Sequence, residues 1–323
     1  MRVAEITEFG DSSTVEVTDH EKPEPGDGEL RVEVKAAGIN FADIMQRRGH
    51  YQGGPEPPYV PGMEVAGVVD AVGDGVGRDV GDEVMGFVNH GGYAEYAIAN
   101  ASGVFDLPEN MSYAEGAGFP VQFLTAHNCL FEWGDLEEDE QVLIHAAAGG
   151  VGTAAVQLAS NAGAEVFGTA STEEKLSLAE ELGCDHPIQY TEVDFVEQVN
   201  DITDGDGVDI VLDGIGGETT TESLKALTHM GRLVAYGAAS GEPGTPNTAD
   251  LLFNNHSVIG YHLGQAMLRT PGKVFGAVPK LNGALESGDL EVIVGHEFDL
   301  EDAAEAHQFI EDRKSSGKVV LKP

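Results

Sequence analysis

The chain has 323 residues, of which 41% are hydrophobic, so it is long enough to bury a large core and to form about two domains. Acidic residues number 56 against 17 basic ones, and the resulting formal net charge of -39 disfavours nucleic acid and anionic membranes as partners. Two cysteines, Cys129 and Cys184, are too few for a disulfide framework or for a structural zinc site built from thiolates.

The acidic residues are spread among apolar segments, which is typical of an ordered protein with a charged, solvated surface. Such a composition resembles that of proteins from salt-loving organisms, in which high ionic strength screens the self-repulsion. The first residues include a glutamate, and no apolar run reaches the length of about 18 residues that a membrane span needs. We therefore expect a cytoplasmic protein.

The first hundred residues are typical of a β-rich domain. Polar and apolar residues alternate over positions 30–34, a run of small apolar residues covers 65–72, and clusters of glycine, proline and aspartate separate such segments. From about residue 142 the pattern changes to strands that are each followed by a helix. The expected elements there are 142–145, 152–161, 165–169, 172–182, 208–213, 218–228 and 232–236.

This alternation of strands and helices predicts an α/β fold with a parallel, doubly wound sheet. After a further strand at 258–261, we expect a helix around 274–286, a strand at 292–298, a helix at 300–313 and a final strand at 318–321. The pattern therefore favours a nucleotide-binding domain at residues 122–261, inserted into a second domain that residues 1–121 and 262–323 form together.

A glycine-rich segment lies between an expected strand and an expected helix. Its pattern, Ala147-x-Gly149-x-x-Gly152, is the dinucleotide fingerprint with alanine in place of the first glycine. Gly149 would let the backbone approach a pyrophosphate, and Gly152 would let the helix pack closely on the strand. Gly150 and Val151 would complete the cradle with N–H groups at the helix N-terminus. The alternative is a tight turn that binds nothing.

The end of the following strand indicates which dinucleotide the chain prefers. Sites for NAD usually place an acidic residue about 20 positions after the glycines, where it holds the ribose 2′-hydroxyl. Residues 168–172 contain no acid, and Lys175 follows them. We therefore expect NADPH, with Ser171, Lys175 and Tyr190 as partners of its 2′-phosphate. Lys175 is alternatively a surface residue that pairs with the glutamates beside it.

Six motifs occur in an order that resembles a known family. They are "AAGINFADIMQRRGHY", "VPGMEVAGVV", "GDEVMGF", "GGYAEYA", "HAAAGGVG" and "VLDGIGG". The chain is similar over nearly its whole length to the zinc-independent quinone oxidoreductases, the zeta-crystallin-like group of the medium-chain dehydrogenase/reductase superfamily. The resemblance implies a GroES-like, β-rich catalytic domain, a Rossmann domain for NADPH, and a homodimer formed through the strand at 258–261.

The same resemblance bears on the metal. Zinc-dependent members of the superfamily carry a cysteine, a His-Glu pair and a second cysteine or histidine, at positions that correspond to Asn40, Met63 with Glu64, and about Val121 here. An amide, a thioether and an aliphatic side chain are poor ligands of zinc, so we expect no metal. Without zinc, hydride transfer favours acceptors that are already electron-poor, such as quinones or alkenes conjugated to a carbonyl.

The family's site residues fall on defined positions of this chain. The resemblance implies that Asn40 and Tyr51 lie beside the substrate, with Tyr51 as the candidate proton donor, and that Thr125 lies near the nicotinamide. It also implies that Tyr236 and Gly237 contact the cofactor, and that Arg313 joins the residues around the 2′-phosphate.

Each of these side chains also has a structural alternative. Tyr51 would then pin a loop rich in glycine and proline, Asn40 would form an internal hydrogen bond, and Thr125 would cap a helix. Tyr236 would pack at a strand end, and Arg313 would pair with a neighbouring acid. Both cysteines are expected to be inert, because neither has a basic neighbour.

The function expected is therefore NADPH-dependent reduction of a small quinone or enone. One alternative is an enoyl-thioester reductase, although this would need a basic patch for the coenzyme phosphates, which so acidic a chain scarcely offers. A non-catalytic NADPH-binding protein is the other. The segment "YQGGPEPPYVPG" is closer to reductase homologues associated with membrane trafficking than to bacterial quinone reductases, which leaves the substrate open.

Overall fold

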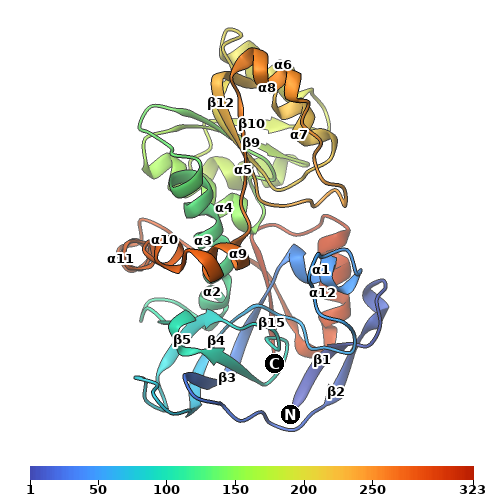
Figure 1. The fold of residues 1–323 in the computed structure, drawn as a ribbon, viewed down its shortest axis with the longest axis vertical. Coiled ribbons are helices and arrows are strands. Elements are labelled where there is room, and N and C mark those ends of the chain that lie inside the picture. Colours follow the sequence, from blue (N-terminus) through green and yellow to red (C-terminus); the bar gives the residue numbers. More distant parts are fainter. The chain divides into compact units, whose positions relative to one another are not determined.

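The computed structural model describes residues 1–323, which form two compact units. The terminal unit contains Met1–Val121 and Val292–Pro323, and both chain ends, marked N and C in Figure 1, belong to it. The central unit contains Gln122–Glu291. The first boundary agrees with the expected one after residue 121, whereas the second lies after residue 291 and not after residue 261.

The second boundary differs because residues 262–291 pack on the central unit. They form α9 (Leu263–Arg269), α10 (Pro271–Phe275) and α11 (Val278–Ser287). The Lys273 ammonium donates to the carbonyl oxygen of Glu132, and Gln157 Nε2 donates to the carbonyl oxygen of Glu291 at 3.0 Å. These helices therefore belong with the parallel sheet, and the single helix expected at 274–286 is divided into α10 and α11.

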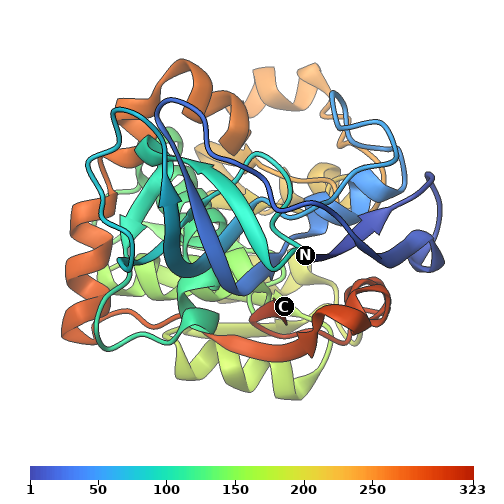
Figure 2. The same ribbon diagram turned by 90° about the horizontal axis from the view of Figure 1, so that it is seen from below.

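Strands from both ends of the chain build the terminal unit, as the blue, cyan and red segments in Figure 2 show. A two-stranded sheet pairs β1 (Arg2–Ile6) with β2 (Val15–Asp19). The larger, seven-stranded sheet has the order β14-β15-β3-β4-β5-β7, with β6 also paired to β3. Its strands are β3 (Glu29–Ile39), β4 (Glu64–Val72), β5 (Glu83–Phe87), β6 (Tyr96–Asn100), β7 (Val104–Asp106), β14 (Val294–Asp299) and β15 (Lys318–Lys322).

The alternation at the start of β3 places apolar side chains in the core of this unit. Leu30, Val32 and Val34 are all buried and belong to one hydrophobic cluster. The antiparallel pairing of β15 with β3, in which Val319 lies opposite Ile39, joins the two ends of the chain. The helices of this unit are α1 (Phe41–Arg47), α2 (Tyr113–Gly118) and α12 (Ala303–Glu311), and short 3-10 turns cover Ser12–Thr14, Ala101–Gly103 and Leu300–Asp302.

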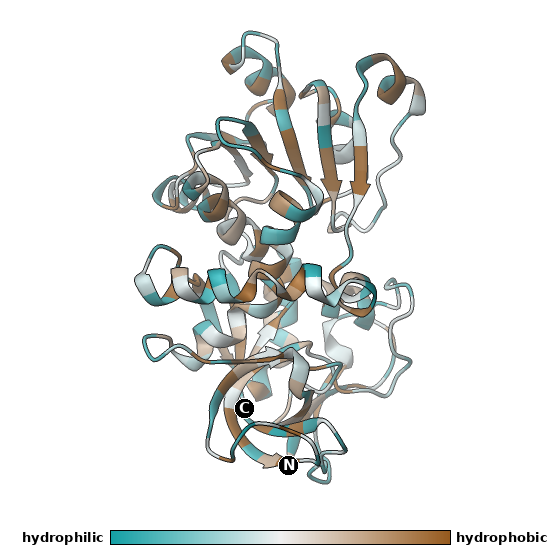
Figure 3. Ribbon diagram, turned by 60° about the vertical axis from the view of Figure 1, so that its left-hand side comes forward, coloured by the Kyte–Doolittle hydropathy of each residue, from teal (hydrophilic) through white to brown (hydrophobic).

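The central unit contains a six-stranded parallel sheet of order β10-β9-β8-β11-β12-β13. Its strands are β8 (Gln141–Ile144), β9 (Glu165–Ala170), β10 (His186–Gln189), β11 (Val208–Asp213), β12 (Leu227–Ala235) and β13 (Ser257–Gly260). Counted within the unit, the order is 3-2-1-4-5-6, which defines the doubly wound Rossmann arrangement expected from the sequence. The strands carry mainly hydrophobic residues, coloured brown in Figure 3, because helices cover both faces of such a sheet.

The helices that precede and connect these strands are α4 (Gly150–Asn161), α5 (Glu173–Glu181), α6 (Phe195–Ile202), α7 (Glu218–Ser223) and α8 (Thr248–Asn254). α3 (Pro120–His127) continues without a break into a π-helix at Asn128–Trp133. The helix expected at 218–228 ends earlier, at Ser223, because β12 already begins at Leu227. No helix of the chain has the length and apolar character that crossing a bilayer requires.

Candidate functional site

The glycine-rich segment forms the connection between β8 and α4. Ala146 has a left-handed backbone with φ of 53°, and α4 begins at Gly150. A Cβ added to Gly152 would lie 2.2 Å from the carbonyl oxygen of Ala146, so only glycine fits at this position. The close packing of helix on turn that the motif predicted is present.

A glycine in the neighbouring strand makes room for the alanine at the first motif position. The Ala147 N–H donates to the carbonyl oxygen of Thr169 at 3.0 Å, and the Ala147 side chain is fully buried. A Cβ on Gly168 would lie 2.9 Å from the Ala147 Cβ. Gly168 in β9 therefore provides the space that the additional methyl group in the turn occupies.

The N-terminus of α4 has the features of an anion-binding site. Its N-cap residue, Gly149, has no side chain, and no other side chain caps the helix. The N–H groups of Gly150, Val151 and Gly152 in the first turn therefore have no acceptor within the helix. Together with the helix dipole, these donors suit a phosphate, and the absence of a side chain at Gly149 leaves room for one.

His145 directly follows β8, at the start of this turn, and is held in one protonation state. The Ser223 hydroxyl donates its only hydrogen to the carbonyl oxygen of Thr219 at 2.6 Å, so it accepts from His145 Nε2 at 2.8 Å. His145 Nδ1 then accepts from the Thr169 hydroxyl at 3.0 Å. Burial lowers the pKa of His145 to about 4. The neutral ring thus ties together β8, β9 and α7, a role that the sequence analysis did not assign.

Three residues expected around a 2′-phosphate lie at one end of the sheet. The Tyr190 N–H donates to the carbonyl oxygen of Ala170 at 3.3 Å, which brings Tyr190 to the end of β9, where Ser171 follows. Lys175 lies in the first turn of α5, and its N–H donates to the N-cap hydroxyl of Thr172. Arg313, the fourth expected member, belongs to the terminal unit, where it follows α12 in a left-handed conformation.

Tyr236 and Gly237 follow β12 and pack on the turn after β11. A Cβ on Gly237 would lie 2.6 Å from the carbonyl oxygen of Gly214, and a Cβ on Gly214 would lie 2.8 Å from the Tyr236 hydroxyl oxygen. The turn is fixed by Asp213, whose Oδ1 accepts from the N–H groups of Ile215 and Gly216. Tyr236 and Gly237 therefore lie at the carboxyl end of the sheet, where doubly wound folds bind their ligands.

Thr125 lies within α3 and is almost fully buried. The backbone of the following residues stays helical, with His127 at φ -57° and ψ -49°, so no new helix begins at this point. The alternative expectation that Thr125 caps a following helix is therefore wrong.

In the terminal unit, Asn40 is held by three groups. Its N–H donates to Asp43 Oδ2 at 2.8 Å, so that Asp43 caps the start of α1. The Asn40 side chain points elsewhere, because Nδ2 donates to Glu64 Oε1 at 2.8 Å and Oδ1 accepts from Lys318 Nζ at 2.8 Å. The internal hydrogen bonds that the alternative reading of Asn40 required are thus present.

Glu64 is the centre of this cluster and is fully buried. Its Oε1 also pairs with the Lys318 ammonium, and its Oε2 accepts from the Val121 N–H at 2.7 Å. Of the positions that correspond to zinc ligands in metal-dependent relatives, Asn40 and Val121 therefore both bind the Glu64 carboxylate, which pairs with the Lys318 ammonium. Nowhere in the chain do three or more histidine, cysteine or acidic side chains gather as metal ligands.

A second buried chain of hydrogen bonds extends from Asp43. The Tyr93 hydroxyl donates to Asp43 Oδ2 at 2.9 Å, so the contact of 3.2 Å between Tyr93 and His307 Nε2 must be donated by the imidazole. Burial raises the pKa of Asp43 to about 6 and lowers that of His307 to about 3. Sequence reasoning did not predict this series of hydrogen bonds. It also did not predict the role of Lys318, for which the sequence offers one signal, namely its position as the first residue of a mainly apolar strand.

Tyr51 follows α1 in the Gly/Pro loop and is partly buried. Burial raises the pKa of Tyr51, and the negative charge of Asp43 raises it further, so the phenol keeps its proton at neutral pH. The Tyr51 carbonyl oxygen also accepts from the Gly54 N–H at 3.0 Å. The residue thus takes part in the loop's own turn while retaining a proton.

Both cysteines are buried, and burial raises the pKa of the Cys129 thiol well above its usual range and that of Cys184 to about 12. Reactive thiolates are therefore disfavoured at both positions.

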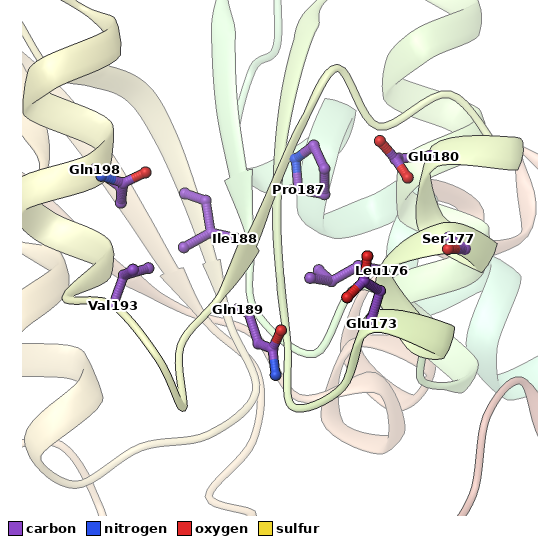
Figure 4. Close-up of a pocket in the computed structure, with 9 residues that line it drawn as sticks. All are labelled: Glu173, Leu176, Ser177, Glu180, Pro187, Ile188, Gln189, Val193 and Gln198. Atoms are coloured by element: carbon purple, nitrogen blue, oxygen red, sulfur yellow. The ribbon is translucent and has the colours of Figure 1, made fainter.

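A hollow lies at the outer edge of the central sheet, around β10 (Figure 4). α5 contributes Glu173 and Glu180 to its lining, and none of the residues of the glycine turn line it. The two carboxylates disfavour phosphate groups, so this hollow is not the site that the glycine turn forms.

A GroES-like sheet combined with a doubly wound unit defines a class of two-domain dehydrogenases and reductases. Residues 26–109 match the family model described as alcohol dehydrogenase GroES-like domain, and residues 150–279 match the model described as zinc-binding dehydrogenase. The chain belongs to the medium-chain dehydrogenase/reductase superfamily, in the zinc-independent branch that contains quinone oxidoreductases.

Several relatives support this membership. The synaptic vesicle membrane protein VAT-1 homolog-like of Mus musculus is 36% identical over 341 residues, which cover 99% of this chain and 81% of that protein. The structure of the Escherichia coli quinone oxidoreductase complexed with NADPH is 32% identical, with a TM-score of 0.94 and complete coverage of both chains. The structure of the CurK enoyl reductase is also 32% identical, with a TM-score of 0.89 over 99% of this chain and 98% of that one.

Proposed function

We propose that this chain is an NADPH-dependent oxidoreductase that reduces quinones, or alkenes conjugated to a carbonyl, without zinc. The proposal rests chiefly on the N-terminus of α4, which begins after Gly149 and has no side-chain cap. The end of β9 adds to it, because residues 168–172 contain no acidic residue. The first feature suits a pyrophosphate, and the second suits a phosphorylated ribose. The superfamily membership and the NADPH complex of the Escherichia coli enzyme agree with both.

Each part of the nucleotide has candidate partners in this chain. Residues 149–152 would hold the pyrophosphate, and Ser171, Lys175, Tyr190 and Arg313 would hold the 2′-phosphate. Thr125 is proposed to lie near the nicotinamide, and Tyr236 and Gly237 are proposed to contact the cofactor. When bound, NADPH supplies a hydride, and the protein orients the cofactor and shields the reaction from water.

The terminal unit supplies the groups proposed to act on the acceptor. The zinc-ligand positions hold Asn40, Met63 and Val121, which lack the thiolate and imidazole donors that zinc requires. An acceptor that is already electron-poor needs hydrogen-bond donors more than a Lewis acid, and Asn40 and protonated Tyr51 are such donors.

The test is a panel of acceptors assayed with NADPH and with NADH at high potassium chloride concentration. The panel contains ortho-quinones, para-quinones, conjugated enones and a crotonyl thioester. We expect quinone or enone reduction with NADPH and a kcat/KM at least tenfold lower with NADH. Comparable dissociation constants for the two nucleotides would contradict the NADPH preference.

An enoyl-thioester reductase is the second candidate, because the CurK enoyl reductase has the same fold over nearly the whole chain. The spacing of eleven residues between Asn40 and Tyr51 also matches that group. The charge of -39 weighs against it, because a coenzyme carries several phosphates. Turnover of the thioester alone would favour this candidate, and NADPH binding without any turnover would favour a non-catalytic protein.

The proposal also includes a homodimer. β13 forms one edge of the central sheet, so a second copy can pair with it about a twofold axis and extend the sheet. α8, which leads into β13, exposes Leu252 and Phe253, the latter 80% accessible to solvent. Exposed apolar side chains of this size beside an edge strand favour an interface.

A further inference from the structure

We infer that Lys318 is a positioning residue that fixes the Asn40 amide, so that its remaining N–H is the donor to the acceptor's oxygen. This inference rests on the proposed function. It assigns a role to a lysine of the terminal unit, and it defines which atom of Asn40 acts.

The orientation of the Asn40 amide follows from its partners. The Lys318 ammonium can only donate hydrogen bonds, and the Glu64 carboxylate can only accept them. Oδ1 must therefore face Lys318 and Nδ2 must face Glu64, at 2.8 Å each. Rotation of the amide by half a turn would place N–H groups against the ammonium and an oxygen against the carboxylate.

Counting the hydrogen-bond partners of the Asn40 amide shows that one of its donors remains. The amide nitrogen has two hydrogens, of which one is bound by Glu64 Oε1, while Oδ1 is taken by Lys318. Asn40 is partly exposed, in contrast to Glu64 and Lys318. The second N–H of Nδ2 is thus the group of Asn40 that an incoming molecule can use, and that molecule must offer an acceptor atom.

The fold determines where Lys318 lies. β15 pairs with β3 so that Val319 is opposite Ile39, which brings the residues just beyond, Lys318 and Asn40, together. Lys318 is only 3% exposed, and its stem packs closely enough that a Cβ on Gly118 would lie 3.2 Å from its Cγ. A buried ammonium needs a partner of opposite charge, and Glu64 provides it.

The arrangement suits a reaction in which negative charge develops on oxygen. The acceptor gains two electrons and one hydrogen as hydride from NADPH, which becomes NADP⁺. Its oxygen then takes one proton, for which Tyr51 is the candidate donor and which water replaces on the phenol. The ammonium at Oδ1 polarises the amide and strengthens the N–H opposite. A preorganised donor of this kind typically contributes about 100-fold or more to kcat.

Two variants separate positioning from folding. Asn40→Ala removes the amide and its N–H while Lys318 and Glu64 stay paired with each other, so we expect kcat to fall by about 100-fold. The double variant Lys318→Met with Glu64→Gln removes both buried charges together and leaves neither unpaired. We expect it to fold, to bind NADPH as the unaltered protein does, and to lose about tenfold in kcat because the amide is no longer fixed.

Lys322→Met is the matched control, because Lys322 lies on the same strand but is half exposed and pairs with Glu297. Its kcat should be unchanged. A second readout needs no turnover, namely the infrared carbonyl stretch of 1,4-naphthoquinone bound in the presence of NADP⁺. We expect the stretch to be lowered in the unaltered protein and in the control, and to return towards its solution value in the other two variants.

The outcomes distinguish the two proposals. If the quinone binds with a lowered stretch but no acceptor is reduced, the proposed function fails and the role of Asn40 stands. If the double variant reduces quinones with unchanged kcat and an unchanged stretch, the inference about Lys318 is wrong and the function stands. If the unaltered protein binds no acceptor at all, both are overturned.

Discussion

At the scale of single residues, His145 couples the stability of the central unit to pH. The folded chain holds the ring neutral, because each nitrogen already has its partner and the residue is almost fully buried. Protonation would add a hydrogen at Nδ1, where the Thr169 hydroxyl donates, and would force that hydroxyl to turn. Protonation of the His145 ring therefore destabilises the folded chain.

We expect the free energy of unfolding to fall as the pH drops below 6.5. The pKa of His145 is about 4 in the folded chain against 6.5 ordinarily, so the unfolded state binds more protons in this window. This contribution to stability is complete above pH 6.5, decreases progressively between pH 6.5 and pH 4, and is fully lost below pH 4. Between pH 7 and pH 5 the loss due to His145 should be ~2 kcal/mol.

The measurement is urea denaturation of the unaltered protein and of His145→Gln at both pH values and at one salt concentration. Because glutamine does not titrate, the variant should lack this part of the pH dependence. Equal slopes in the two proteins would contradict the assignment. Asp43, whose pKa is raised to about 6, contributes with the opposite sign and is common to both.

Single residues also show where sequence reasoning succeeds. Gly149 and Gly152 could be identified because the turn they build is local, and its geometry depends on neighbours within a few positions. Lys318 could not, because its partners Asn40 and Glu64 lie 278 and 254 positions away in the sequence. No periodicity reveals a contact that depends on how two distant strands pair.

At the scale of elements, the connection of β8 to α4 depends on the absence of a side chain. We expect Gly152→Ala to destabilise the central unit by ~1–3 kcal/mol and to weaken NADPH binding more than tenfold, because the added carbon meets backbone 2.2 Å away. Backbone cannot move aside as a flexible side chain would. Thermal unfolding and nucleotide fluorescence titration measure the two effects.

Gly283→Ala is the control for this prediction. Gly283 lies inside α11, and a Cβ added there would have no neighbour within 4 Å. Alanine at such a helical position should stabilise the chain by up to ~1 kcal/mol and leave nucleotide binding unchanged. If both substitutions had the same effect, the close contact at Gly152 would not be the cause.

The elements themselves were predictable to different degrees. β8, β9 and β11 lie within about a residue of the expected bounds, because buried parallel strands are apolar runs with clear ends. The end of α7 and both ends of α10 were not predicted, since their short, mixed sequences carry no strong period. The three helices at 262–291 show that the partner on which an element packs is harder to predict than the element.

At the scale of the whole molecule, the net charge of -39 and the exposed apolar side chains of α8 act in opposite directions on association. Charge repulsion opposes the approach of two copies, and salt screens it within about 10 Å at 0.1 M. The proposed dimer should therefore strengthen as the salt concentration rises.

We expect light scattering at high potassium chloride to give twice the chain mass of 34.0 kDa. Leu252→Glu combined with Phe253→Glu should give the monomer mass, because each added carboxylate would lie near its own copy across the twofold axis. Leu268→Glu, at a position of similar exposure on α9, serves as the control and should remain dimeric. A monomer at all salt concentrations would rule out the dimer.

The pairing of β15 with β3 affects the order in which parts of the protein can fold during its synthesis. Glu64 emerges from the ribosome 254 residues before Lys318, which at about 5–20 residues per second is a delay of roughly 13–50 s. Throughout this interval the carboxylate lacks its counter-ion and stays in water, while the whole of Gln122–Glu291 is translated and is able to fold. The central unit can therefore fold before Lys318 is synthesised, and the cluster around Asn40 can assemble only after that.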